Sequence, residues 1–244
     1  MIEESRAIVL SRRAFKENEQ IVSMFTERFG RVDFILYGAF SKKNGRQQAF
    51  LQPLSLVTVI ADYRNGRDLQ VVSKVRNEVP LSSLLIDPYK NTTALFLSEI
   101  LTRALRTNEM DPPLFSFLFT SVNWLDAADQ SQISNFHVAF LVRLSVFLGF
   151  TPNLGPLRAD LPYFDLTQSE YVRYAGHNPN VLGGQEQLFL RNLLRINYRN
   201  MALFRFSRSE RSQLLERIVR YYQTHIQGFG ELRTLDVLHA VFDF

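Results

Sequence analysis

The sequence predicts an α+β protein of more than one domain, with a small N-terminal β-barrel followed by a mostly helical domain. Up to about residue 75, short apolar runs alternate with turn signals, as they do in antiparallel strands. After residue 80 the apolar residues recur at helical spacing instead. The 244 residues, 46% of them hydrophobic, suffice for one large domain or a few small ones. We therefore expect domains at residues 1–80 and 81–244.

Five strands are expected within the N-terminal domain. In the third strand, Val32, Phe34 and Leu36 alternate with residues of the opposite face, so that one face can pack into a core. Asn65-Gly66 is a turn signal between the last two strands. Five short strands of this kind fit a closed Greek-key barrel, the OB-fold, although an SH3-like barrel would give nearly the same pattern. The strands are expected at residues 7–10, 21–25, 32–40, 54–60 and 69–72.

The second domain is expected to be helical with one irregular insert. Asp111-Pro112 has the pattern of an N-cap followed by proline in the first helical position. Ser207 and Glu210 form a capping box at the start of another helix. Prolines and glycines break the pattern in the insert, residues 151–184, and leave room for one hairpin at about residues 163–174. The helices are expected at about residues 95–105, 111–125, 131–148, 185–197, 207–225 and 234–242.

The charge of the chain is unevenly distributed. Residues 1–80 contain 13 Lys and Arg against 9 Asp and Glu, whereas the remaining residues contain 15 of each. There is no cysteine, which excludes disulfides, thiolate metal sites and cysteine nucleophiles. The start lacks the regions of a secretory signal, and no segment is long and apolar enough to span a bilayer. We expect a soluble cytoplasmic protein that does not bind membranes.

The main candidate for a binding site is the end of the third strand together with the basic loop after it. Lys42, Lys43 and Arg46 surround Gly45 in this loop, and Tyr37 precedes it. Long cations contact phosphates and an exposed ring stacks on a base, so nucleic acid is the polyanion that fits. The alternatives are a solvated turn and a tyrosine packed against a neighbouring strand. Further candidates at strand edges or in the second hairpin are Arg12, Arg13, Arg31, Arg64 and Arg67.

A second basic candidate lies in the helical half. Arg191, Arg195 and Arg199 recur at four-residue spacing, which predicts one helix face and a second DNA strip. The neutral net charge of this half predicts nearby acids, so a solvated face is the favoured interpretation.

Enzymatic functions find little support in the motifs. The chain has no GxxxxGK[ST] loop, no GxSxG turn and no HExxH helix. The strongest enzymatic alternative is a metal-dependent nuclease that uses Asp160, Asp165 and His177. Acids in a proline-rich loop are usually turn formers. We therefore expect no catalytic residue, no metal site and no cofactor.

Several segments resemble the bacterial recombination mediator family RecO. They are AIVLSRRAFKENEQIVSMFTERFGRVDFILYGAFSKK with LQPLSLVTV, FHVAFLVRLSVFLGFTPNL, and HIQGFGELRTLDVLHAVF. The resemblance covers nearly the whole chain. It implies a nucleoid-associated protein with an OB-fold domain, a helical domain and a zinc-binding insert. It also implies binding of single- and double-stranded DNA, strand annealing, and RecA loading with RecR and single-strand-binding protein.

Two features depart from the family pattern. Many relatives carry paired cysteines in the insert, and this chain has none, so we expect a degenerate, zinc-free ribbon. Relatives often have basic residues where Tyr37 and Phe40 stand, so stacking is expected to replace part of the charge. An RNA-binding OB-fold adaptor remains an alternative, because charge and stacking serve either polymer. Aromatic burial is expected to hold the insert through Tyr163, Phe164, Tyr171 and Tyr174.

The resemblance also predicts a receptor for the acidic, aromatic tail of single-strand-binding protein. Such a receptor needs an apolar pocket with a cation at its rim. The helix at residues 131–148 offers Phe140, Arg143, Leu144 and Phe147, although a core position is the more ordinary role for its apolar members.

Overall fold

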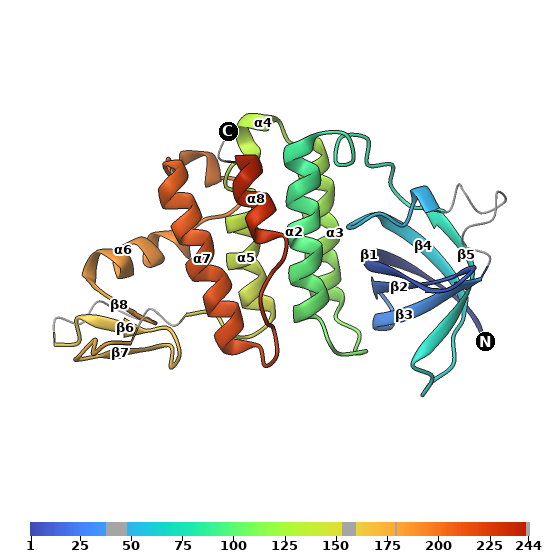
Figure 1. Ribbon diagram of the computed structural model, residues 1–244, viewed down its shortest axis with the longest axis horizontal. Coiled ribbons are helices and arrows are strands. Elements are labelled where there is room, and N and C mark those ends of the chain that lie inside the picture. Colours follow the sequence, from blue (N-terminus) through green and yellow to red (C-terminus); the bar gives the residue numbers. More distant parts are fainter. Residues whose placement is uncertain (38–47, 153–159, 179, 243–244) are drawn as a thin grey trace. The chain divides into compact units, whose positions relative to one another are not determined.

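The computed structural model describes residues 1–37, 48–152, 160–178 and 180–242 (Figure 1). It divides into two compact units. The barrel unit comprises Met1–Ala128 and Leu232–Phe244, and the helical unit comprises Asp129–Glu231. The barrel strands end before residue 80 and the next helix begins after it. The domain boundary at residue 80 itself stays a prediction.

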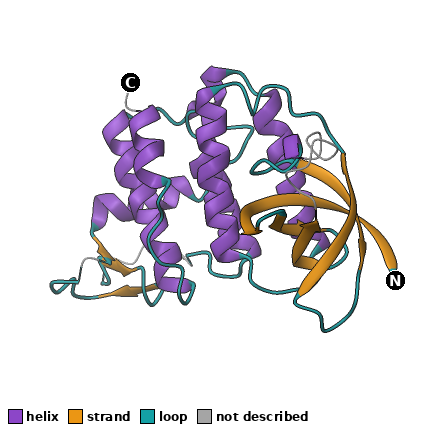
Figure 2. Cartoon of the chain, turned by 45° about the vertical axis from the view of Figure 1, so that its right-hand side comes forward, coloured by secondary structure: helices purple, strands orange, loops and turns teal. Residues whose placement is uncertain are grey.

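The N-terminal strands close into a five-stranded barrel, drawn in orange in Figure 2. Neighbouring strands are antiparallel, except that β3 runs parallel to β5, and the order is β1-β2-β3-β5-β4. This is a closed Greek-key barrel of the OB-fold type, so the predicted fold class is confirmed. The strands are β1 (Ile2–Lys16), β2 (Glu19–Thr26), β3 (Gly30–Tyr37), β4 (Leu56–Asp62) and β5 (Leu69–Asn77).

Alternation along the strands fills the barrel interior. On β3 the inward positions are Val32, Phe34 and Leu36, as predicted, and they pack against buried side chains of the other strands. β1 is much longer than the predicted residues 7–10. Its ends carry many charged residues, yet the backbone there still pairs with β2 and β4. A strand end that is held by its backbone alone has no apolar alternation to reveal it.

Among the described residues, the barrel unit also contains α2 (Pro88–Ala104), α3 (Pro112–Ala127) and α8 (Leu235–Phe242). Asp87 and Asp111 cap α2 and α3 by accepting backbone N–H groups, and each cap precedes a proline. The predicted Asp111 cap is therefore confirmed. α2 packs on β1, where the Ser98 hydroxyl donates to the Leu10 carbonyl, and α8 packs on α2.

In the part of the helical unit that the structure describes, the helices are α4 (Gln130–Ile133), α5 (Phe136–Phe147), α6 (Gly184–Leu193), the 3-10 helix η2 (Met201–Leu203) and α7 (Arg208–His225). The single helix predicted at residues 131–148 is wrong, because the chain breaks between α4 and α5. At the break, Asn135 donates its side-chain amide to the carbonyls of Met201 and Phe204. The capping box of Ser207 and Glu210 is confirmed. Among the described residues, no helix has the length and apolar character that a membrane crossing requires.

The insert forms a small sheet in the order β7-β6-β8. Its strands are β6 (Tyr163–Asp165), β7 (Glu170–Val172) and β8 (Val181–Leu182). The β6–β7 hairpin is as predicted, whereas β8 is not. Phe164 is fully buried, and its ring centroid lies 5.3 Å from that of Tyr171, while Tyr221 of α7 joins the same core. Aromatic burial thus holds the hairpin, but the predicted part of Tyr174 is wrong because 79% of this residue is exposed.

Candidate nucleic-acid interface

One end of the barrel, at the tip of the β1–β2 hairpin, brings predicted residues together. The strand register places Lys16, Glu19 and Tyr37 in one cross-strand row. Two rows further along the ladder, Arg13 lies opposite Ile21 and is exposed. Tyr37 is 56% exposed, so it is not packed away against a neighbouring strand. A ring accessible to this degree beside cations suits stacking on a base.

Phe15 belongs to the same end of the barrel and is absent from the sequence prediction. The register of β1 shifts between Ala14 and Lys16, which is the mark of a β-bulge. Phe15 lies at this irregularity and is 49% exposed. The Lys16 ammonium lies 5.4 Å from the centroid of its ring. An aromatic residue inside the basic run Arg-Arg-Ala-Phe-Lys was the available signal.

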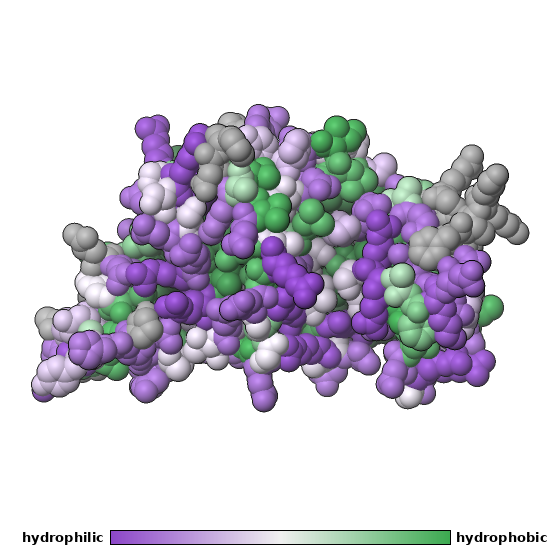
Figure 3. All heavy atoms as spheres, in the orientation of Figure 1, coloured by the Kyte–Doolittle hydropathy of each residue, from purple (hydrophilic) through white to green (hydrophobic). Residues whose placement is uncertain are grey.

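Two cations of β5 are also missing from the prediction. Val75 faces the core, so its neighbours Lys74 and Arg76 face outward, and both are exposed. Because β5 runs parallel to β3, with Val71 opposite Ile35, the later residues of β5 lie toward the Tyr37 end. In Figure 3, hydrophilic side chains dominate the visible face of the barrel around a small apolar patch. We call six exposed side chains the hairpin-end surface: Arg13, Phe15, Lys16, Tyr37, Lys74 and Arg76.

The predicted basic loop lies outside the described residues and contains Lys42, Lys43 and Arg46. The chain on either side of it is held at the hairpin end. Before the loop, Tyr37 pairs with Glu19. After it, the Gln48 side chain donates to the Gln20 side chain at 3.0 Å and accepts from Arg12 at 3.4 Å. Tyr37 and Gln48, the described residues on either side of this loop, therefore lie at the hairpin end.

Arg31 has a structural role instead. Its guanidinium donates to the carbonyls of Thr102 and Leu105, both at 2.7 Å, at the C-terminal end of α2. A cation at this position satisfies carbonyls that lack a partner inside the helix. Because its donors are used within the barrel unit, we leave Arg31 out of the interface.

Arg64 and Arg67 lie in the β4–β5 turn, at the other end of the barrel. Phe29 of the β2–β3 turn stacks on Tyr63, with ring centroids 4.0 Å apart, which places the two turns side by side. Arg64 pairs with Asp62 at 2.8 Å. The N-terminal ammonium and then Arg64 lower the pKa of this carboxyl by hydrogen bonding. The structure does not bring these two arginines to the hairpin-end surface.

The three arginines predicted for one helix face do not share one. α6 ends at Leu193, so Arg195 and Arg199 lie in the turns that follow it, and both are exposed. Arg191 is half-buried and donates to the Tyr171 hydroxyl at 2.7 Å. The predicted placement is therefore wrong, whereas DNA contact by these residues stays a prediction.

The residues predicted as a tail pocket are mostly interior. Phe140 and Leu144 are fully buried in α5. Arg143 is exposed, and its guanidinium lies 5.5 Å from the centroid of the Phe147 ring. Tail binding by these four residues stays a prediction, but only the end of the set that carries Arg143 is accessible to a ligand.

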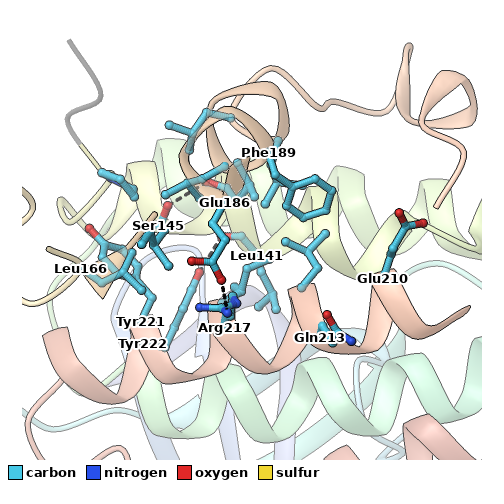
Figure 4. A pocket seen from close by; sticks show the side chains of 18 residues that line it. Leu141, Ser145, Leu166, Glu186, Phe189, Glu210, Gln213, Arg217, Tyr221 and Tyr222 are labelled. Carbon is cyan, nitrogen blue, oxygen red and sulfur yellow. Dashed lines mark hydrogen bonds and ion pairs between the residues drawn. The ribbon is translucent and has the colours of Figure 1, made fainter. Parts of the chain in front are cut away.

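A cavity of about 360 Å³ lies between α5, α6 and α7 in the helical unit (Figure 4). Its lining is largely apolar and includes Leu141, Phe189 and Tyr221 from the three helices. Glu186 and Arg217, both partly exposed, form an ion pair among the lining residues. The sequence prediction missed this cavity because its walls come from segments far apart in the chain.

Of the two acids proposed for a nuclease, Asp165 is placed as a turn former. Asp165 accepts the backbone N–H groups of Thr167 at 2.7 Å and Gln168 at 3.3 Å, and so shapes the β6–β7 turn. Asp160 and His177 are exposed. In the part of the chain that the structure describes, no three His, Asp or Glu side chains are grouped so that they could hold a metal ion.

The chain matches two family models in succession. Recombination protein O N terminal covers residues 1–77, which contain the barrel, and Recombination protein O C terminal covers residues 86–155. The chain belongs to the RecO family. Curated relatives named DNA repair protein RecO match the chain over its length. That of Bacteroides fragilis is 38% identical over 245 residues, and that of Azobacteroides pseudotrichonymphae 33% over 243, with 100% of both chains covered in each case. That of Flavobacterium johnsoniae is 33% identical over 239 residues, 98% of either chain.

The two RecO family models cover the hairpin-end surface and the cavity to different extents. The hairpin-end surface lies entirely within the N-terminal RecO region. The cavity takes Leu141 and Pro152 from the C-terminal RecO region, while α6 and α7 lie beyond residue 155. The predicted family is confirmed for the chain as a whole by the full-length relatives.

Proposed function

We propose that this RecO-family protein is a DNA repair and homologous recombination mediator. It binds single- and double-stranded DNA, anneals complementary strands and, with RecR and single-strand-binding protein, promotes the loading of RecA. In this proposal the protein binds and pairs strands and is not an enzyme. The observation that carries the proposal is the hairpin-end surface, where four cations and two exposed rings share one end of an OB-fold barrel.

Each type of side chain in this surface has a separate part. Lys and Arg neutralise phosphates and release counterions, which gives affinity that falls with salt. Phe15 and Tyr37 offer ring faces to unpaired bases, and stacking tolerates any sequence. A mediator that must act on arbitrary sequences needs both properties. The names of the relatives favour DNA over RNA as the polymer.

The combined variant Arg13→Ala, Lys16→Ala and Lys74→Ala tests this assignment. We expect a roughly 10- to 100-fold loss of affinity for a single-stranded DNA oligonucleotide at moderate salt. The slope of log affinity against log salt should fall by about 2, because each phosphate contact on a single strand contributes about 0.7. Fluorescence anisotropy over a salt series measures both quantities.

A matched control removes the same charge from exposed positions elsewhere: Arg173→Ala, Arg220→Ala and Arg233→Ala. It should stay within about twofold of the wild type. Equal losses in the two variants would mean that net charge alone matters, and an unchanged salt slope in the first would exclude the hairpin-end surface. Annealing of oligonucleotides coated with single-strand-binding protein then tests the mediator activity, and a matched RNA oligonucleotide tests the choice of polymer.

We also propose that the cavity of the helical unit binds the tail of single-strand-binding protein. Its apolar walls suit the aromatic end of the tail of single-strand-binding protein, and Arg217 suits an acidic residue of that tail. In the free protein Glu186 forms an ion pair with Arg217, so an acidic residue of the tail would have to displace the Glu186 carboxylate. We propose this location in preference to the predicted set around Phe140, because Phe140 and Leu144 are buried.

Binding of a fluorescent tail peptide distinguishes the two locations. Phe189→Ala and Arg217→Ala should each weaken it by about tenfold, since a filled apolar pocket and its charged partner each contribute on the order of 1 to 2 kcal/mol. Leu188→Ala, an exposed neighbour on α6 that does not line the cavity, is the control. If Arg143→Ala weakens the peptide and the cavity variants do not, the original α5 site is the correct one.

A further inference from the structure

The stretch from residue 187 to residue 209 contains no acidic residue but five arginines. The two acidic residues at the ends of this stretch, Glu186 and Glu210, already have partners. Glu186 pairs with Arg217, and the Glu210 carboxylate accepts the Ser207 backbone N–H at 2.7 Å. The sequence-based expectation of neighbouring acids is therefore not met within this stretch, and a concentrated positive charge remains.

Three of the five arginines face solvent within eleven residues: Arg195, Arg199 and Arg205. None of them forms an ion pair with the residues that the structure describes. We call residues 195–205, which begin and end with two of these side chains, the arginine segment. Arg211 lies beside the segment and is half-buried. Burial and then the positive charge of Arg208 lower its pKa, and the second of these causes reflects the concentration of cations here.

The backbone of the arginine segment is held in place. Asn135 donates to the carbonyls of Met201 at 3.0 Å and Phe204 at 2.7 Å. Asn200 donates to the Arg195 carbonyl at 2.9 Å, and Ile196 and Met201 are buried beneath. Fixed backbone means that little ordering entropy is lost when the arginines bind a ligand.

Apolar surface is exposed within the segment and at Phe206, directly after it. Leu203 is 79% exposed, and the half-exposed rings of Phe204 and Phe206 lie 5.9 Å apart. Guanidinium groups bind phosphates in forked geometry, and aromatic or apolar faces beside them accept unstacked bases. A ligand that combines regular negative charge with flat apolar groups fits this surface better than a purely acidic peptide does.

We propose that the arginine segment is a second binding surface for single-stranded nucleic acid, located on the helical unit. The inference rests on the proposed function, and it adds a strand that the barrel does not hold. A chain with two such surfaces holds two strands at once, which raises the effective concentration of one strand near the other. That is the requirement of an annealing protein.

The test counts short single-stranded DNA oligonucleotides bound per full-length chain by native mass spectrometry. The wild type should bind two, and the triple variant Arg195→Ala, Arg199→Ala and Arg205→Ala should keep one. Annealing by this variant should slow by about tenfold or more, since the second strand is no longer held. The same three positions changed to lysine should retain the second strand, because lysine still binds phosphate.

Two further variants separate the possible outcomes. The control Arg173→Ala, Arg220→Ala and Arg233→Ala should still bind two oligonucleotides. If the proposed barrel function fails but this inference holds, the wild type binds one oligonucleotide and the arginine-segment variant binds none. If the arginine-segment variant binds as many as the wild type, the inference is overturned. It is equally overturned if that variant keeps its oligonucleotides and loses only an acidic peptide.

Discussion

The hairpin-end surface and the arginine segment both present cations, but they are positioned by different means. Backbone pairing of β1, β2 and β3 places Arg13, Lys16 and Tyr37, so that removing one side chain leaves the others where they are. The arginine segment has no strand partners and depends on the amides of Asn135 and Asn200. Cations placed by a β-ladder are therefore robust, whereas those placed by side-chain hydrogen bonds can be displaced from a distance.

The electrostatic surroundings differ as well. Acids are interleaved with the cations at the hairpin end, where Lys16 lies 3.6 Å from Glu19. The arginine segment has no acid of its own. A phosphate that binds the barrel must therefore compete with carboxylates, while one that binds the segment does not. Stacking by Tyr37 and Phe15 compensates for this on the barrel.

The largest expected effect comes from Asn135→Ala. This buried side chain donates to two carbonyls and accepts from Arg211 at 3.1 Å, so its loss leaves buried polar groups without partners. We expect a destabilisation of about 2 to 4 kcal/mol in urea unfolding. Amide hydrogen exchange should speed up in residues 195–206 and remain unchanged in the barrel strands.

Asn192→Ala is the matched control for this change. Asn192 is an exposed asparagine of α6, and its side chain forms no hydrogen bond with the residues that the structure describes. Asn192→Ala should lower the free energy of unfolding by less than about 0.5 kcal/mol. If Asn135→Ala accelerates exchange equally in the barrel strands, the two surfaces do not differ in the way that their hydrogen bonds indicate.

A smaller effect is expected from Tyr37→Ala, which removes stacking and leaves the charges. Affinity for single-stranded DNA should fall by about 1 to 3 kcal/mol, the range for one stacked base. The salt slope should stay the same, because no phosphate contact is lost. Tyr37→Phe keeps the ring and should bind like the wild type. A loss in Tyr37→Phe would mean that the hydroxyl is used, whereas a changed slope in Tyr37→Ala would mean that phosphate contacts are disturbed as well.

The sequence predicted the parts of the fold that depend on neighbouring residues. Short apolar runs between turn signals located all five barrel strands, and local capping patterns located the starts of α3 and α7. The break before α5 was missed, because the partners of Asn135 lie more than sixty residues away. The true ends of β1 were missed because its backbone pairs with β2 and β4 where the sequence has no apolar alternation.

The same distinction applies to the candidate site. Tyr37 was found because its position on the outward face follows from the strand pattern. Lys74 and Arg76 follow the same rule on β5, where they flank buried Val75, and could have been found. Arg31 could not be excluded from sequence, because its acceptors are the carbonyls at the end of α2. The cavity of the helical unit likewise needs three helices to be brought together.

The smallest expected effect is a difference between the two units in how their stability depends on pH. Glu99 has the role in the barrel unit that Asn135 has in the helical unit, since it holds a distant segment through the N–H groups of Arg233 and Thr234 at 3.1 and 2.9 Å. Burial alone would raise the pKa of Glu99, but hydrogen bonds from Thr234, Arg233 and Arg103 lower it overall. A carboxyl with a lowered pKa stabilises the fold above its unfolded pKa, and this contribution is lost as pH falls through the folded value.

Glu99→Gln should therefore cost about 1 kcal/mol at neutral pH, the net worth of the hydrogen bonds that weaken. The difference from the wild type should shrink as pH falls below the usual range of a glutamate and through the lowered pKa of Glu99, where the wild-type carboxyl itself becomes protonated. The Asn135→Ala deficit should not shrink in this way, because an amide does not titrate in that range. Urea unfolding of both variants over the same pH series decides the matter. A Glu99→Gln deficit that persists at low pH would mean that packing, and not the charge of the carboxylate, holds the C-terminal segment of the barrel unit.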